Sequence, residues 1–172
     1  MTKLLSVLLA MAVLLGLSAC GNNASPAAQS TETNNVQTSV PGYGFVFQGV
    51  ILIPGDAFAA DKLSEPQYIY TQTNSVLGGK DTFYNYTDIE VVVYDDGKTA
   101  VIRSVMVLSP NLKTSEGMAL GDPLEHVTKL YGNSYTQIGD EWLFTKEKTV
   151  LAILTQDGFV AGIEYRLTEN NL

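Results

Sequence analysis

Two stretches of the chain share one pattern, and this pattern decides the predicted fold. The first is "IPGDAFAADKLSEPQ" (Ile53–Gln67), and the second is "ALGDPLEHVTKLYGN" (Ala119–Asn133). Each contains Gly-Asp, then a short stretch typical of a helix, then a residue that ends helices, Pro66 in the first and Gly132 in the second. A recurrence in fixed order indicates two copies of one structural unit.

The flanking residues extend the pattern on both sides. A short apolar run precedes each copy, and segments typical of strands follow it, up to the hairpin signals Asp96-Gly97 and Asp157-Gly158. We therefore predict an α+β domain over residues 42–172, built from two tandem β-α-β-β-β repeats. Repeat one covers about residues 42–112 and repeat two about 113–172, with short helices packed on one face of an antiparallel sheet.

The second copy carries the clearer helix signals. Asp122 is a good N-cap, Pro123 suits the first helical position, and Gly132 suits the left-handed position after the last turn. In the first copy, Asp56 is the expected cap and Pro66 the expected end. Both copies are therefore expected to contain a capped helix.

Alternation of apolar and polar residues predicts which strand residues face the core. Over residues 88–94, Ile89, Val91 and Val93 share one face. Over residues 159–167, the same rule places one set of side chains together, namely Phe159, Ala161, Ile163, Tyr165 and Leu167.

The N-terminus predicts an export signal. Lys3 is followed by an uncharged, mostly apolar run from Leu4 to Leu17, which is shorter than the about 20 residues that a transmembrane helix needs. The run Leu17-Ser-Ala-Cys20 resembles the bacterial lipobox, in which the cysteine thiol receives diacylglycerol before cleavage. We predict a signal peptide at residues 1–19 and lipidation of Cys20, the only cysteine.

The residues after Cys20 predict a tether. Residues 21–40 are rich in Asn, Ser, Thr, Ala and Gln and show no periodicity, so residues 20–41 are expected to be the lipidated cysteine and a flexible linker. Two acyl chains anchor a protein stably. The expected location is therefore the extracytoplasmic face of the cell membrane.

The composition excludes one class of partner. The formal net charge is −8 at pH 7, whereas nucleic-acid phosphates require a basic surface. We therefore expect no nucleic acid partner. A lipidated Cys20 also leaves no cysteine for a disulfide, so the core alone must hold the domain together.

Two segments resemble a known group of proteins. "LKTSEGMALGDPLEHVTKLYGN" and "GGKDTFYNYTDIEVVVYDD" resemble signatures of uncharacterised lipoproteins from Gram-positive, clostridia-like bacteria. Such proteins are similar to the tandem-repeat fold of β-lactamase-inhibitor protein. The resemblance covers about residues 42–167 and implies a fold rather than an activity. A cysteine typical of the group is missing from Asn74–Gly78.

The residue types that carry chemistry form no recognisable catalytic or metal-binding set. His126 is interpreted as an exposed helix residue, and Asp95-Asp96 as part of a turn rather than a calcium loop. We expect no catalytic residue, no metal site and no cofactor.

The tyrosines are the best candidates for a binding surface. Tyr68, Tyr70, Tyr84 and Tyr86 recur at a spacing of two in strands expected to be neighbours, so they are candidates for one aromatic face. Tyrosine is enriched at interfaces, whereas ordinary packing within the sheet is the competing interpretation.

These observations favour a non-enzymatic, membrane-anchored module that binds a protein or an envelope polymer. Two other interpretations stay open. One is a cell-surface enzyme or small-ligand binding protein with an unrecognised site, and the other is a purely structural envelope component.

Overall fold

A computed structural model describes residues 42–171, which belong to one compact unit, Thr38–Leu172. The predicted signal peptide, the predicted lipidation of Cys20 and the whole predicted tether, residues 20–41, lie outside the described residues. The described elements are β1 (Phe45–Phe47), β2 (Val50–Leu52), η1 (Ala60–Lys62), β3 (Tyr68–Thr73), β4 (Lys80–Asn85), β5 (Ile89–Asp95), β6 (Ala100–Val107), α1 (Leu124–Tyr131), β7 (Thr136–Ile138), β8 (Glu141–Lys146), β9 (Thr149–Gln156), β10 (Phe159–Leu167) and η2 (Glu169–Asn171).

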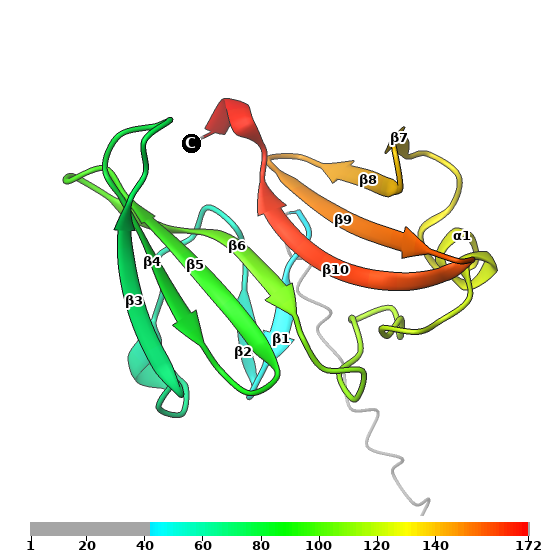
Figure 1. Ribbon diagram of the computed structural model, residues 1–172, viewed down its shortest axis with the longest axis horizontal. Helices are drawn as coiled ribbons and strands as arrows, with labels where there is room; N and C mark the ends of the chain where they lie inside the picture. Colours follow the sequence, from blue (N-terminus) through cyan, green and yellow to red (C-terminus); the bar gives the residue numbers. More distant parts are fainter. Residues whose placement is uncertain (1–41, 172) are drawn as a thin grey trace, which may run out of the picture. The chain divides into compact units, whose positions relative to one another are not determined.

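An eight-stranded antiparallel sheet dominates the domain. Its strand order is β3-β4-β5-β6-β10-β9-β8-β7, so two runs of four consecutive strands meet where β6 pairs with β10 (Figure 1). The β1–β2 hairpin forms a separate two-stranded sheet. The domain is thus mostly antiparallel sheet with one short α-helix in the described residues, which is compatible with the predicted α+β class.

The predicted β-α-β-β-β unit is not what the structure contains. Each run in the sheet has four strands, and the strand predicted directly before α1 is not formed, because residues 117–120 are irregular. The first expected helix is reduced to the 3₁₀ turn η1. Gly55 donates a backbone hydrogen bond to Ile102 at 2.7 Å, and Asp56 accepts one from Ile102 at 2.8 Å. These bonds tie the expected start of the helix to β6, so Asp56 is not a cap.

Helix α1 begins one residue later than predicted and is not capped by Asp122. The Asp122 carbonyl accepts a hydrogen bond from Val160 at 2.8 Å, which holds this residue against β10. Its side chain instead accepts the backbone N–H of Ala119 at 3.0 Å. The predicted C-terminal end is confirmed, because Gly132 follows α1 with φ of 79°.

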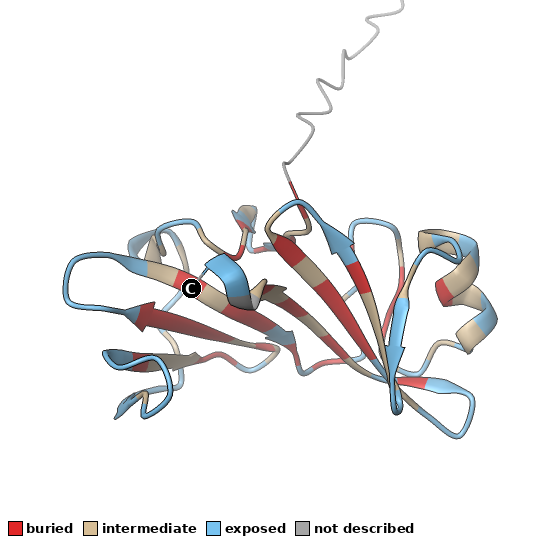
Figure 2. Ribbon diagram, turned by 90° about the horizontal axis from the view of Figure 1, so that it is seen from above, coloured by how far each residue is buried: buried red, intermediate tan, exposed pale blue. Residues whose placement is uncertain are grey.

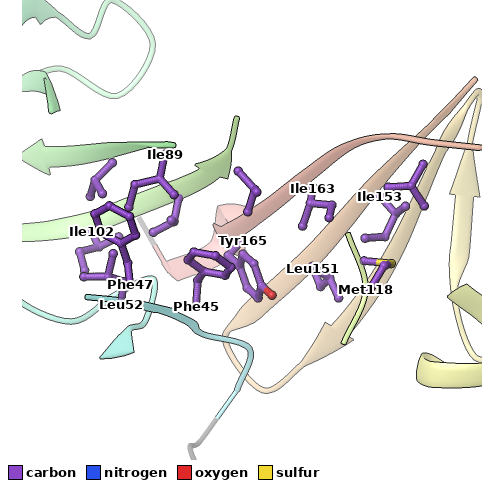
Figure 3. Packing of buried hydrophobic residues seen from close by; sticks show 14 of the residues in the cluster. Phe45, Phe47, Leu52, Ile89, Ile102, Met118, Leu151, Ile153, Ile163 and Tyr165 are labelled. Atoms are coloured by element: carbon purple, nitrogen blue, oxygen red, sulfur yellow. The ribbon is translucent and has the colours of Figure 1, made fainter. Parts of the chain in front are cut away.

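The core lies between one face of the sheet and the elements that cover it. Figure 3 shows Phe45, Phe47 and Leu52 of the β1–β2 hairpin against sheet residues such as Ile89 and Tyr165. Val127 of α1 and Met118, from the segment before this helix, belong to the same buried cluster. We call this side of the sheet the covered face. Every core residue in the described part of the chain lies between Phe45 and Leu167.

The burial of strand residues follows the predicted alternation only in part, because Val92 and Tyr94, on the other face of β5, are buried as well. Ile89, Val91 and Val93 are all buried, as predicted. In β10 the register shifts between Val160 and Gly162, so Val160 is buried and Phe159 is 52 % exposed. The extra residue of a bulge reverses the alternation, which is why the prediction was wrong for Phe159 and Ala161 but correct for the rest of β10. Figure 2 shows the buried residues along the strands and largely exposed turns.

Candidate functional site

The face of the sheet opposite the hairpin and α1, which we call the open face, holds the candidate site. Strand register places its side chains in rows that run across the sheet. One row runs through Asn85, Glu90, Met106, Glu164 and Ala152. The next runs through Tyr70, Phe83, Val92, Ser104, Arg166 and Val150. Both rows cross the β6–β10 junction, so the two halves contribute to one surface.

A groove of about 930 Å³ lies on the open face at this junction. Its lining includes Arg103 and Ser104 of β6 together with Glu164 and Arg166 of β10. The β3–β4 loop adds Asn74, Val76 and Leu77, and the C-terminal segment adds Thr168 and Asn170. The Tyr94 hydroxyl donates to the carbonyl of Leu77 at 3.3 Å, which fastens the β3–β4 loop over the open face.

Ion pairs line the groove. Arg103 Nε lies 3.4 Å from Asp81 Oδ1, without the alignment of a hydrogen bond, and Asp81 Oδ2 accepts from the Asn74 amide at 2.9 Å. Asp81 is only 3 % exposed, so its carboxylate needs these partners. Arg166 contacts Glu141 and lies 3.3 Å from Glu164.

Glu90 is a half-buried carboxylate for which the described residues provide no ion-pair partner. Burial raises the pKa of Glu90 above its ordinary value, and the charge of Glu164 raises it further. The two carboxylates flank Met106 in the same row, and Met106 is 38 % exposed. The centre of the open face therefore favours a positively charged group.

Two of the predicted tyrosines form an exposed aromatic stack on the open face. Tyr68 is 56 % and Tyr70 is 43 % exposed. Tyr70 stacks on Phe83 with ring centroids 4.5 Å apart and planes within 4°, and Tyr68 lies 6.2 Å from Tyr70. We call Tyr68, Tyr70 and Phe83 the aromatic stack.

The other two predicted tyrosines are elsewhere, so the four do not form one surface. Tyr84 pairs in register with Ile69 and Val91, and it packs on Phe58 on the covered face at 4.7 Å. Tyr86 is 4 % exposed and packs on Phe47 at 5.5 Å. Residues that pair across neighbouring strands point to the same face, so the register decides which tyrosines meet. Tyr70 pairs with Phe83, whereas Tyr84 was expected beside it.

The remaining candidates have structural roles. His126 is partly exposed, and its Nδ1 lies 2.9 Å from Asp122 Oδ2, a partner that the sequence did not suggest. The backbone N–H groups of Thr99 and Lys98 both donate to Asp96 Oδ1 at 2.8 Å, which confirms that this segment is a turn, and these bonds lower the pKa of Asp96. Among residues 42–171, no group of three His, Cys, Asp or Glu residues has the arrangement of a metal site.

Sequence reasoning missed Arg103, Arg166, Glu90 and Asp81. Alternation along β10 puts Glu164 and Arg166 on the face opposite Ile163 and Tyr165, and this was a usable signal. The pairing of β6 with β10, which brings these residues to Arg103 and Ser104, joins segments far apart in the sequence and has no local signal.

Comparison of the chain with models of protein families, with curated proteins and with solved structures found no match. Within the described part of the chain, no helix has the length and apolar character that crossing a membrane requires.

Proposed function

We propose that the chain is a membrane-anchored extracytoplasmic lipoprotein whose folded domain is a non-enzymatic binding module for a protein or an envelope polymer. The binding surface in this proposal is the open face, from the aromatic stack to the groove. Lipid on Cys20 provides the anchor, and residues 21–41 provide the tether.

The aromatic stack is the single observation that carries the proposal. Tyr68 and Tyr70 keep about half of their surface exposed although they belong to a sheet with a well-packed opposite face. Exposed apolar residues continue across the open face at Met106, Ile138 and Leu154. A surface that combines exposed aromatic rings with further exposed apolar residues is typical of a recognition site.

Charge supports a partner with cationic groups. Carboxylates outnumber guanidinium groups among the described residues at the centre of the open face, which are Asp81, Glu90, Glu141 and Glu164 with Arg103 and Arg166. The chain as a whole is also acidic, with a formal net charge of −8. Complementary charge speeds encounter and selects partners more than it adds affinity.

The groove favours a second candidate function, binding of a small ligand. Its volume of about 930 Å³ lies within the usual range of ligand pockets, which is about 300–1,000 Å³. It is open to solvent along the sheet, and its charged groups already have partners within the domain. A macromolecular segment laid across the open face uses the stack and the groove together, so we prefer that function.

We also infer that the two four-strand runs of the sheet are copies of one unit, revised from the predicted form. The support is that each run follows a short helical segment, η1 before β3–β6 and α1 before β7–β10. The resemblance to clostridia-like lipoproteins with tandem repeats is part of the same proposal.

The test is cross-linking of the intact lipoprotein on its native cells, with captured molecules identified by mass spectrometry. The test variant combines Tyr68→Ala with Tyr70→Ala. The matched control combines Val46→Ala with Ile51→Ala, which are 50 % and 48 % exposed on the hairpin outside the open face. Loss of one recurrent partner with the tyrosine variant alone supports the proposal.

Two results would count against it. If both variants capture the same partner equally well, the open face is not the binding surface. If a Cys20→Ser chain stays on the membrane after processing, the anchor is wrong. When no partner is captured, a screen of small ligands and glycans against the domain tests the second function.

A further inference from the structure

Strand β3 forms one edge of the eight-stranded sheet, and it lacks the usual protection of an edge. All six residues of Tyr68-Ile-Tyr-Thr-Gln-Thr73 are exposed. None is charged, none is proline, and the pairing with β4 is regular along its whole length. Proteins normally blunt edge strands with charges, proline, bulges or very short strands, because an open edge invites another strand. The opposite edge, β7, has only three residues.

Two backbone hydrogen bonds identify which groups of β3 point away from the sheet. Tyr86 donates to Ile89 at 2.9 Å, which directs the even-numbered residues of β4 toward β5 and the odd-numbered ones toward β3. Asn74 donates to Gly79 at 3.2 Å, in agreement with this pattern. Tyr68, Tyr70 and Gln72 therefore bond to β4, and the N–H and C=O groups of the intervening residues, Ile69, Thr71 and Thr73, point outward.

We propose that β3 pairs antiparallel with β3 of a second copy of this chain, about a two-fold axis at Thr71. Strands bond through residues whose polar groups face each other, and this fixes the register. Thr71 lies opposite Thr71 of the second copy, and Ile69 lies opposite Thr73. The next row places Tyr70 opposite Gln72. The two sheets then continue as one.

The absence of charge on β3, together with the exposed apolar loop beside it, favours a second copy as the occupant. An acidic chain normally repels its own copy, but β3 carries no charge, so self-pairing places no like charges opposite each other. The same register places the β3–β4 loop at the level of Tyr68 of the second copy. This loop contains Val76, which is 89 % exposed, and Leu77, which is 40 % exposed, so apolar contact extends beyond the strand.

The first experiment measures mass against concentration for a chain that begins at Gly21, which contains every core residue that the structure describes and has no cysteine. Because one edge strand buries little area, we expect a weak dimer, with the average mass rising between about 10 µM and about 1 mM. Thr71→Lys places two ammonium groups opposite each other and should abolish the rise. Thr71→Val keeps the strand neutral and should preserve it. A chain that is monomeric at every concentration overturns the proposal, as does a dimer that Thr71→Lys leaves intact.

The second experiment tests the register by disulfide trapping. Opposite residues in a hydrogen-bonded antiparallel pair have Cα atoms about 5.5 Å apart, within the range that a disulfide spans. Thr71→Cys should therefore form a covalent dimer faster than Val76→Cys, although Val76 is the more exposed position. Equal or slower trapping at position 71 contradicts the register. Both variants should first show the circular dichroism and unfolding midpoint of the starting chain. These outcomes do not depend on the function proposed for the open face.

Discussion

Replacement of Tyr165 by phenylalanine should stabilise the domain. Tyr165 is 1 % exposed, and its ring packs on Phe45 with centroids 5.6 Å apart. Its hydroxyl is buried and has no hydrogen-bond partner among the described residues. Burial of an unpaired hydroxyl costs about 1–3 kcal/mol in protein mutants. Phenylalanine keeps the ring and removes this cost, although the small void left by the oxygen atom offsets part of the gain. We expect the free energy of unfolding to rise by about 1 kcal/mol.

Tyr131→Phe is the matched comparison, because this hydroxyl has partners. It lies 2.7 Å from Thr114 Oγ1 and 2.8 Å from Glu116 Oε2, so it can donate to the carboxylate and accept from the threonine. Its removal should cost about 1–2 kcal/mol. Burial raises the pKa of both tyrosines, so both hydroxyls stay protonated at neutral pH and the two variants are comparable.

The assay is urea unfolding of the chain that begins at Gly21, monitored by fluorescence and by circular dichroism. The midpoint should rise for Tyr165→Phe and fall for Tyr131→Phe, with the same dependence on urea, since neither change alters the surface exposed on unfolding. The melting temperature should move by about 3–5 °C per kcal/mol for a domain of this size. If Tyr165→Phe loses stability while Tyr131→Phe is neutral, the assignment of hydrogen-bond partners around the core is wrong.

Three more predictions concern the open face, the loop over it and the core. Glu90→Gln should stabilise the domain at neutral pH. The raised pKa of Glu90 means that the native state holds this proton more tightly than the unfolded chain, so native stability falls as pH rises from about 4.5 through the raised pKa. Urea midpoints measured across this pH range should therefore fall less in the variant than in the starting chain. Gly79→Ala should cost more stability than Gly78→Ala, because both have positive φ but only the Cβ at Gly79 would lie 2.3 Å from the Asp95 carbonyl oxygen; equal losses of about 1 kcal/mol would show that the loop gives way. Leu151→Ala should cost about 2–5 kcal/mol in the same assay, since the side chain is fully buried and its removal leaves a cavity.

Local signals in the sequence predicted a substantial part of the fold. Alternation placed Ile89, Val91 and Val93 in the core, and the Asp-Gly pairs predicted the hairpin turns. The end of α1 at Gly132 was also predicted, because a left-handed residue that stops a helix is a local requirement. Each of these features depends on backbone preferences within a few residues, which is why the sequence reveals them without an alignment.

The candidate site was predicted only in part. Tyr68 and Tyr70 lie on one exposed face, but Tyr84 and Tyr86 belong to the covered face and the core. The spacing of two correctly indicated that Tyr68 and Tyr70 share one face and that Tyr84 and Tyr86 share one face. The register of β3 relative to β4, which decides whether the two pairs meet, could not be predicted from it. A shift of one residue in register moves every side chain of a strand to the other face, and only the pairing of whole strands fixes it.

By itself, the sequence determined the antiparallel strands, the turns between them and the acidic character, and the anchor at Cys20 stays a prediction of the sequence. Tertiary structure alone decided that β6 pairs with β10, and this pairing builds the groove from Arg103, Ser104 and Arg166. It also decided that Asp56 and Asp122 bond to neighbouring strands instead of capping helices. The physical reason is common to these cases. A backbone polar group takes whichever partner the packed chain brings within reach, and long-range contacts set that choice after local preferences have been satisfied.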